Sequence, residues 1–199
     1  MASMVNHDQK LCFLHFQKTA GWWISKILKD EGFEIVDIKK YGGHLGVTSM
    51  PLGYQSFGFV RHPVSWYQSL FNYLSTIDWK LHGHNFQDLK CNNINGFIEK
   101  TQEHKKFVLI DMYKNFFAVG TESESENILK YENIYDEMIK ISRKFSLQIE
   151  QKVTDTKELF VNKSDRFEDT LSLSSLNYIF CSCDEIFDRF EYRRAQFYR

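Results

Sequence analysis

Two short segments of the sequence combine cationic side chains with the small residues that let a backbone approach an anion. The first is residues 15–23, in which Lys18 is followed by Thr19, Ala20 and Gly21. A strand that passes through such a turn into a helix presents backbone N–H groups to a ligand, and the helix dipole attracts negative charge. Lys18 adds a mobile positive charge at that point. The segment favours phosphate or sulfate binding, and an ordinary turn with a surface lysine is the alternative.

The second segment is residues 57–69, where Arg61 follows an apolar stretch and Ser69 lies eight residues later. Arg61 is expected at the carboxyl end of a strand, the edge where open α/β sheets bind their ligands. Pro63 suits the first turn of a following helix, which would carry Ser69. A guanidinium can contact two phosphate oxygens, and Ser69 can share the same anion. A structural salt bridge is the alternative role for Arg61.

The elements that must position these segments alternate between short apolar runs and helical patterns. Strands are predicted at 11–16, 33–38, 56–60 and 127–131, because short apolar or alternating runs are typical of them. Helices are predicted at 22–28, 63–75, 94–100, 135–145 and 171–197, from apolar residues at helical spacing. Strands separated by helices favour an α/β fold with a parallel sheet.

Length and composition favour one globular domain over residues 1–199. The chain is 43% hydrophobic and 26% charged, which is enough to bury a core and argues against disorder. No segment rich in proline, glycine or serine marks a second domain. Residues 72–106 are polar, rich in histidine and asparagine and weakly periodic, so we interpret them as a lid or acceptor-binding insertion.

Charge and hydropathy exclude several classes of function. The formal net charge is −1, with 25 basic and 26 acidic residues, so no basic excess supports nucleic-acid binding. No apolar run approaches the ~20 residues that span a bilayer, and no secretory signal is present. Four scattered cysteines do not form a disulfide framework, which indicates a cytoplasmic protein. His82, His84 and Cys91 lack the spacing of metal ligands, so no metal is expected.

Taken together, the segments resemble the sulfotransferase superfamily, in particular its Golgi-type and bacterial branch. Residues 14–21 are similar to the family's 5′-phosphosulfate loop, written I-P-K-T-A-G or Y-P-K-S-G-T-T-W. Arg61 and Ser69 have the spacing of its 3′-phosphate motif, and 128–134 is similar to its R-Y-E-D-L strand. Residues 160–164 resemble a late N-x-S segment, which is the least specific match. The matches are in order along the chain.

The resemblance implies a three-layer, P-loop-like fold without a required metal. It also implies that the chain transfers a sulfonate group from 3′-phosphoadenosine 5′-phosphosulfate (PAPS) to an acceptor hydroxyl or amine, leaving adenosine 3′,5′-bisphosphate (PAP). Lys18 would stabilise the charge that develops on the leaving phosphate. Arg61 and Ser69 would bind the 3′-phosphate. The donor-binding residues that it implies are Gln17, Lys18, Thr19, Ala20, Gly21, Trp22, Trp23, Arg61, Ser69 and Tyr131.

The tryptophan pair departs from the family pattern, which places Thr or Ser after the glycine. Thr19 is therefore the remaining hydroxyl donor of the loop. Trp23 falls where one branch of the family has an adenine-stacking tryptophan, and core packing is its alternative role. Trp22 replaces a hydroxyl, so the backbone N–H groups would have to hold the anion.

A general base must take the proton of the acceptor, and histidine is the usual choice near neutral pH. His44 lies in a glycine-rich segment after the second predicted strand, where relatives of the family often have a G-H pair. We predict His44 as the base, with Glu132 as the alternative. His15 is predicted to be a buried structural histidine.

The acceptor is not readable from the sequence, and a small molecule or a carbohydrate fits equally well. Tyr73, Trp79, His82 and Phe86 of the predicted lid should line its site. Two other functions stay open. A non-catalytic nucleotide-binding protein on the same fold would bind the ligand without transfer, and a small-molecule kinase would require Mg²⁺ and ATP. The oligomeric state is also open.

Overall fold

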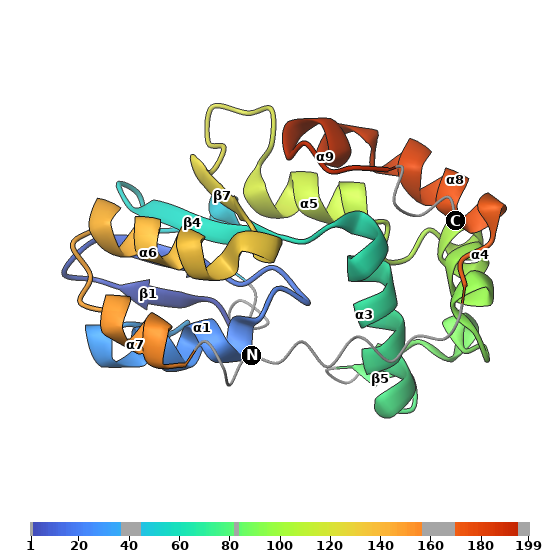
Figure 1. Ribbon diagram of the computed structural model, residues 1–199, viewed down its shortest axis with the longest axis horizontal. Helices are drawn as coiled ribbons and strands as arrows, with labels where there is room; N and C mark the ends of the chain where they lie inside the picture. Colours follow the sequence, from blue (N-terminus) through green and yellow to red (C-terminus); the bar gives the residue numbers. More distant parts are fainter. Residues whose placement is uncertain (1, 37–44, 82–83, 157–169, 195–199) are drawn as a thin grey trace. The chain divides into compact units, whose positions relative to one another are not determined.

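The structure is a computed structural model that describes residues 2–36, 45–81, 84–156 and 170–194 (Figure 1). The described chain forms two compact units. The first runs as far as Arg61 and resumes at Tyr113, whereas the second takes His62–Met112 and the described residues from Thr170 onward. The one-domain organisation stays a prediction of the sequence.

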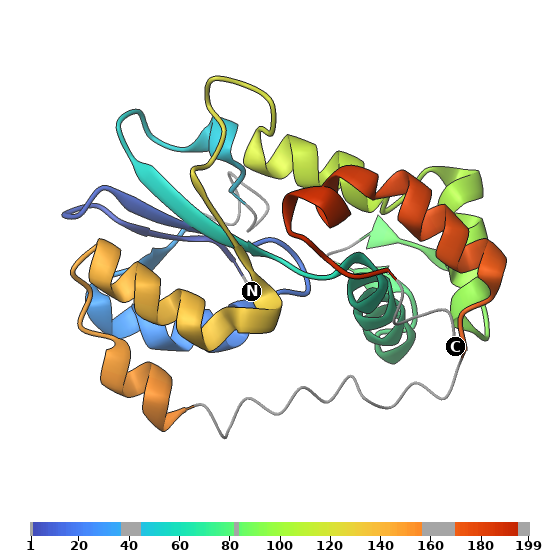
Figure 2. The same cartoon turned by 45° about the horizontal axis from the view of Figure 1, so that its top comes forward.

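The first unit contains a five-stranded mixed sheet within the described residues, in the order β3-β1-β2-β4-β7. Its strands are β1 (Met4–Asn6), β2 (Leu11–Leu14), β3 (Glu34–Ile35), β4 (Gln55–Val60) and β7 (Asn127–Lys130). Strands β2, β4 and β7 run parallel, as expected, and Figure 2 shows β7 (yellow) beside β4 (teal). The α/β class is confirmed.

The prediction of an all-parallel sheet is wrong, because β1 is antiparallel to both of its neighbours, β2 and β3. It pairs with β2 in a hairpin whose register sets Met4 opposite Phe13. Three residues are too few to show the alternation by which strands are recognised in a sequence. The N-terminal segment therefore gave no signal of the strand that separates β2 from β3.

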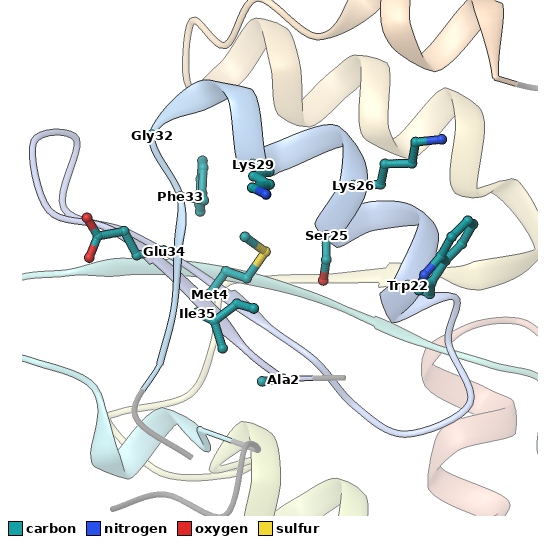
Figure 3. Close-up of a pocket in the computed structure, with 10 residues that line it drawn as sticks. All are labelled: Ala2, Met4, Trp22, Ser25, Lys26, Lys29, Gly32, Phe33, Glu34 and Ile35. Atoms are coloured by element: carbon teal, nitrogen blue, oxygen red, sulfur yellow. The ribbon is translucent and has the colours of Figure 1, made fainter. Parts of the chain in front are cut away.

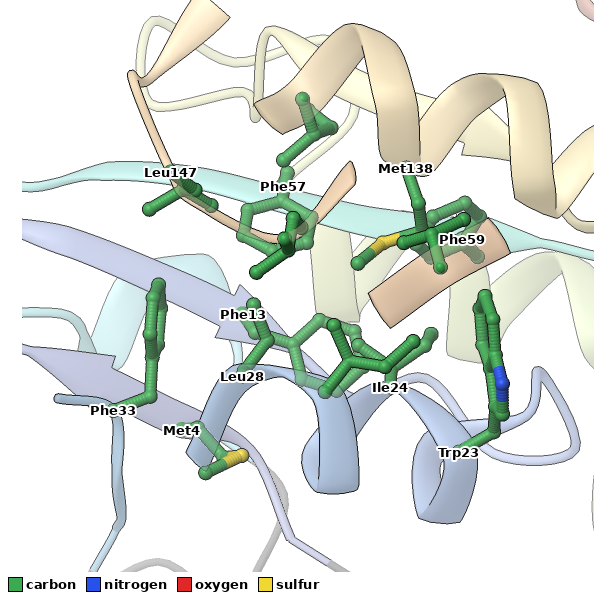
Figure 4. Close-up of a cluster of buried hydrophobic side chains, with 14 of the residues drawn as sticks. Met4, Phe13, Trp23, Ile24, Leu28, Phe33, Phe57, Phe59, Met138 and Leu147 are labelled. Carbon is green, nitrogen blue, oxygen red and sulfur yellow. The ribbon is translucent and has the colours of Figure 1, made fainter. Parts of the chain in front are cut away.

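Helices α1 (Gly21–Leu28), α6 (Ile134–Lys144) and α7 (Glu150–Asp155) pack against one face of this sheet. Phe13, Phe57 and Phe59 point to that face, because alternate residues of a strand share a side. Figure 4 shows these rings against Ile24 and Leu28 of α1. The resulting core holds α1 against the strands that precede and follow it.

The opposite face of the sheet is packed by the Tyr113–Phe117 part of α5 (Leu109–Phe117), a helix that the sequence analysis did not predict. Gly58 of β4 makes room for it. A Cβ atom at Gly58 would lie 2.7 Å from a ring carbon of Phe117 and 2.9 Å from the Leu14 carbonyl oxygen. Helices therefore flank both faces of the sheet.

The second unit is mostly helical and has its own core. It contains α3 (Pro63–Thr76), the strand pair β5 (Lys80–Leu81) and β6 (His84–Asn85), α4 (Ile94–His104), α8 (Leu173–Ser182) and α9 (Asp184–Arg189). Across both units, the described residues include 3₁₀ turns at Lys29–Glu31, Val47–Ser49, Gln87–Leu89 and Tyr131–Asn133. The single C-terminal helix predicted for 171–197 is in fact two helices within the described residues. None of the described helices is long and apolar enough to cross a membrane.

The described residues of the predicted lid, 72–81 and 84–106, belong to this second unit. Trp79 is 3% exposed, and its ring lies 5.9 Å from Phe71 and 5.8 Å from Phe97. The expectation that Trp79 lines an acceptor site is therefore wrong, because its ring is part of the core. Tyr73 is exposed, and His82 lies outside the described residues.

Candidate functional site

The strand order places both predicted segments at one edge of the sheet. After β2 the chain goes to β3 on one side, and then crosses to β4 on the other side of β2. In open α/β sheets, ligands bind at the carboxyl ends of the strands where the chain reverses direction in this way. The loop 15–20 leaves the carboxyl end of β2, and Arg61 leaves that of the neighbouring parallel strand β4.

The loop between β2 and α1 is a tight turn with two left-handed residues. Lys18 has φ 65° and Ala20 has φ 60°, which are uncommon values for residues with a Cβ atom. The Thr19 hydroxyl is buried and donates a hydrogen bond to the Phe16 carbonyl at 2.5 Å. This hydroxyl therefore closes the loop, and the ligand-donor role predicted for it would require that bond to break.

Helix α1 begins without a capping side chain. Its N-cap residue is Ala20, whose side chain makes no capping hydrogen bond to the first turn. The first N–H groups of a helix have no partner within the helix, and they attract anions when nothing else caps them. Gly21 and Trp22 supply such groups directly after Lys18.

The side chain of His15 leaves no room for a Cβ atom at Gly21. A Cβ atom at position 21 would lie 2.0 Å from His15 Nε2, so only glycine fits beside this ring. His15 is buried, as expected, and its backbone N–H donates to Ser3 Oγ at 3.0 Å. This contact could not be predicted from the sequence, because residues 15 and 21 meet only when the turn is formed.

Arg61 reaches the loop from β4 and braces it. Its Nη1 donates to the Lys18 carbonyl at 3.4 Å, and its guanidinium carbon lies 4.7 Å from the ring centroid of Tyr131. Arg61 is 6% exposed and Tyr131 is 5% exposed. The structure thus brings together three of the predicted residues, from the ends of three adjacent parallel strands. Tyr131 packs on Arg61, so it positions the guanidinium.

The positive charges of Lys18 and Arg61 lie close together, and this affects the pKa of Lys18. Burial, and then the nearby Arg61 charge, lower the pKa of Lys18 from 10.5 to about 8. Both causes act against the ammonium form, because low polarity and a second cation each disfavour it. An anion bound beside Lys18 and Arg61 would offset both, so the site is built to take negative charge.

The two tryptophans of α1 differ in their exposure to solvent. Trp23 is 4% exposed, packs edge-on against Tyr135 at 5.3 Å, and donates from Nε1 to Thr156 Oγ1 at 3.0 Å. Trp23 thus packs as the core-packing alternative expects, and its stacking on adenine stays a prediction. Trp22 is 65% exposed at the start of the helix.

The remaining predicted residues lie in several parts of the chain. Gln17 is half-buried in the loop, and Glu132 is exposed after β7. Ser69 is half-buried on α3, which belongs to the second unit, whereas Arg61 ends the first. The predicted base, His44, lies outside the described residues, as does 160–164.

No family model, curated protein or solved structure matches this chain. The described residues also contain no group of three or more His, Cys, Asp or Glu side chains that could hold a metal ion. The candidate site is therefore defined by the residues at the carboxyl edge of the sheet.

Proposed function

We propose that this chain is a sulfotransferase that moves a sulfonate group from PAPS to an acceptor hydroxyl or amine. The observation that carries the proposal is the convergence of Lys18 and Arg61 at the carboxyl edge of β2 and β4. Two cations are held together there beside the uncapped N-terminus of α1, which is a suitable place for a ligand with phosphate and sulfate groups. We also propose the P-loop-like fold and a cytoplasmic location.

The proposal gives each residue of the site a role. The N–H groups of Gly21 and Trp22, with the Lys18 ammonium, would hold the 5′-phosphosulfate of the donor. Arg61 would bind the 3′-phosphate, and Tyr131 packs on its guanidinium. When bound, PAPS supplies the sulfonate to be transferred.

The chain's own contribution to the reaction is charge and proton transfer. The acceptor oxygen forms a bond to sulfur as the bond between sulfur and the phosphate oxygen breaks, which leaves PAP. Lys18 stabilises the negative charge that collects on that phosphate oxygen. His44 takes the acceptor proton, in keeping with the sequence-based prediction.

The experiment is a transfer assay with a sulfur-labelled donor. Purified protein is mixed with labelled PAPS and a panel of phenols, sugars and hydrophobic alcohols, and both labelled product and PAP are measured. Transfer that is lost in Lys18→Met and retained in Lys10→Met, an exposed lysine elsewhere, supports the proposal. A folded protein that binds no PAP and transfers no label would overturn it.

A second candidate is a nucleotide-binding protein that performs no transfer, and one observation favours it. Thr19 carries the only hydroxyl of residues 15–23, and that hydroxyl already donates to Phe16. The donor would then lack a side-chain hydroxyl on its phosphosulfate. PAP binding that depends on Arg61, without transfer to any acceptor of the panel, would identify this function.

A further inference from the structure

A pocket of about 730 Å³ lies in the first unit between α1 and the strands β1 and β3, and the proposed reaction does not take place in it. Trp22, Ser25, Lys26 and Lys29 form its helical wall (Figure 3). Their spacing of three and four residues places them on one helix face. This is the face opposite the buried residues Trp23, Ile24, Ile27 and Leu28. The remaining lining residues are Ala2, Met4, Gly32, Phe33, Glu34 and Ile35.

The interior of this pocket is mostly apolar. Met4 and Phe33 form part of it, and Ile35 and Trp22 leave 61% and 65% of their surface open to water. An apolar ligand that covers these two exposed side chains would remove apolar surface from water, which is favourable. A pocket of this volume is in the range that holds small molecules.

Positive charge lies along one side of the pocket. Lys26 Nζ lies 5.7 Å from the Trp22 ring centroid, and Lys29 follows one turn later on the same face. Among the described residues, Asp30 forms its salt bridge with Lys152, and it interacts with Lys29 only as a nearby charge. The one acidic lining residue, Glu34, lies at the opposite end of the pocket from Trp22 (Figure 3).

We propose that this pocket binds a free single-chain amphiphile with an anionic head, such as a medium-chain carboxylate. The alkyl chain lies along Met4, Phe33 and Ile35 and covers the Trp22 ring, and the head lies at Lys26 and Lys29. Charge complementarity selects the anion, and the apolar walls select the chain. This inference does not depend on the proposed transferase activity, because none of these contacts involves Lys18 or Arg61. Trp22 contributes its ring here, whereas the proposed donor site uses its backbone N–H.

Tryptophan fluorescence can report this binding at one position. Trp23, Trp66 and Trp79 are at most 4% exposed, so Trp22 is the water-exposed indole of the four. Decanoate, kept below its micelle concentration, is titrated into the full chain beside decan-1-ol and acetate. We expect a saturable blue shift and protection from acrylamide quenching with decanoate, a weaker response with decan-1-ol, and none with acetate.

Variants separate the two parts of the proposal. Removing both charges in Lys26→Met/Lys29→Met should weaken decanoate about three- to tenfold and leave decan-1-ol unchanged, because exposed charge pairs contribute modestly. The matched control Lys80→Met/Lys140→Met, which removes two exposed lysines elsewhere, should bind as wild type. Ile35→Asp should abolish binding of both ligands, and Trp22→Phe should remove the signal.

Three results would overturn the inference. The first is no saturable response to decanoate in a protein whose Trp22 is quenched freely. The second is a response that is equal for decanoate and decan-1-ol and indifferent to the two lysines. The third is a shift that follows protein concentration with dimer formation in sedimentation, or that requires anionic lipid vesicles, since either would mean another occupant.

Discussion

The guanidinium of Arg61 donates a hydrogen bond to the backbone carbonyl of Lys18, so the residue that ends β4 braces the loop that follows β2. The two residues are far apart in the sequence, and they meet because β2 and β4 are parallel neighbours. This contact also holds two positive charges close together. The first predictions follow from the effect of that arrangement on Lys18.

Anion binding should weaken as pH rises through about 8, the pKa of Lys18. Below this pH the side chain is an ammonium ion and attracts the ligand, whereas above it the neutral amine does not. Inorganic sulfate is a suitable probe because it stays a dianion throughout, and calorimetry at pH 6.5 and 9.5 measures the change. In Lys18→Met the affinity should be low and independent of pH. Wild-type affinity that is the same at both pH values would contradict the role of Lys18.

Lys18→Met should stabilise the protein near neutral pH. The folded-state pKa of Lys18 is about 8 and its ordinary value is 10.5, so between these values the unfolded chain binds more protons. The wild-type free energy of unfolding should therefore rise between pH 8 and 10.5, as the folded protein escapes the cost of the buried ammonium. Urea titrations at pH 7 and 10.5 should show this rise in wild type and a smaller one in Lys18→Met. A variant less stable than wild type at pH 7 would contradict it.

Gly21→Ala should destabilise the first unit by about 2 kcal/mol, because the new methyl group overlaps the His15 ring. Sulfate binding should fall with it, since the ring or the loop must move. The control is Gly46→Ala, whose added Cβ lies 3.4 Å from the nearest atom, and which should change stability far less. Equal unfolding midpoints for the two variants in urea would show that the ring and the glycine are not in contact.

Truncation of the two tryptophans of α1 should destabilise the protein by very different amounts. Trp23→Ala removes a ring from the core and should cost about 3–5 kcal/mol of unfolding free energy. Trp22→Ala removes an exposed ring and should cost less than about 0.5 kcal/mol. Chemical denaturation of both variants measures the difference. A mild effect of Trp23→Ala together with lost PAP binding would support the adenine-stacking role.

The sequence predicted the parts of the fold in which local pattern and burial agree. Largely apolar runs marked β2 and β4, because strands buried on both faces show no polar alternation. Strand β7 ends the strand order and is mostly half-buried. The placement of Lys18 and Arg61 followed from this, since residues after adjacent parallel strands share an edge. Arg61 and Lys18 are in contact there, and their role in binding stays a prediction.

The features that the sequence did not reveal depend on distant contacts. β1 is three residues long and is defined by its partners. The turn geometry that places His15 against Gly21 has no local signature, and Trp23 and Trp79 had spacings that fitted either a core or a site. In each case tertiary packing decided the outcome.

The most direct test is calorimetric titration of PAP into wild-type protein and Arg61→Gln, with Mg²⁺–ATP as a second ligand. Arg143→Gln is the matched control, because Arg143 is an exposed arginine of the same unit that pairs with Glu150. The account predicts micromolar binding of PAP to wild type and to Arg143→Gln, a loss of at least about tenfold in Arg61→Gln, and preference for PAP over Mg²⁺–ATP. Absence of PAP binding to folded wild-type protein, or binding that Arg61→Gln leaves unchanged, would contradict it.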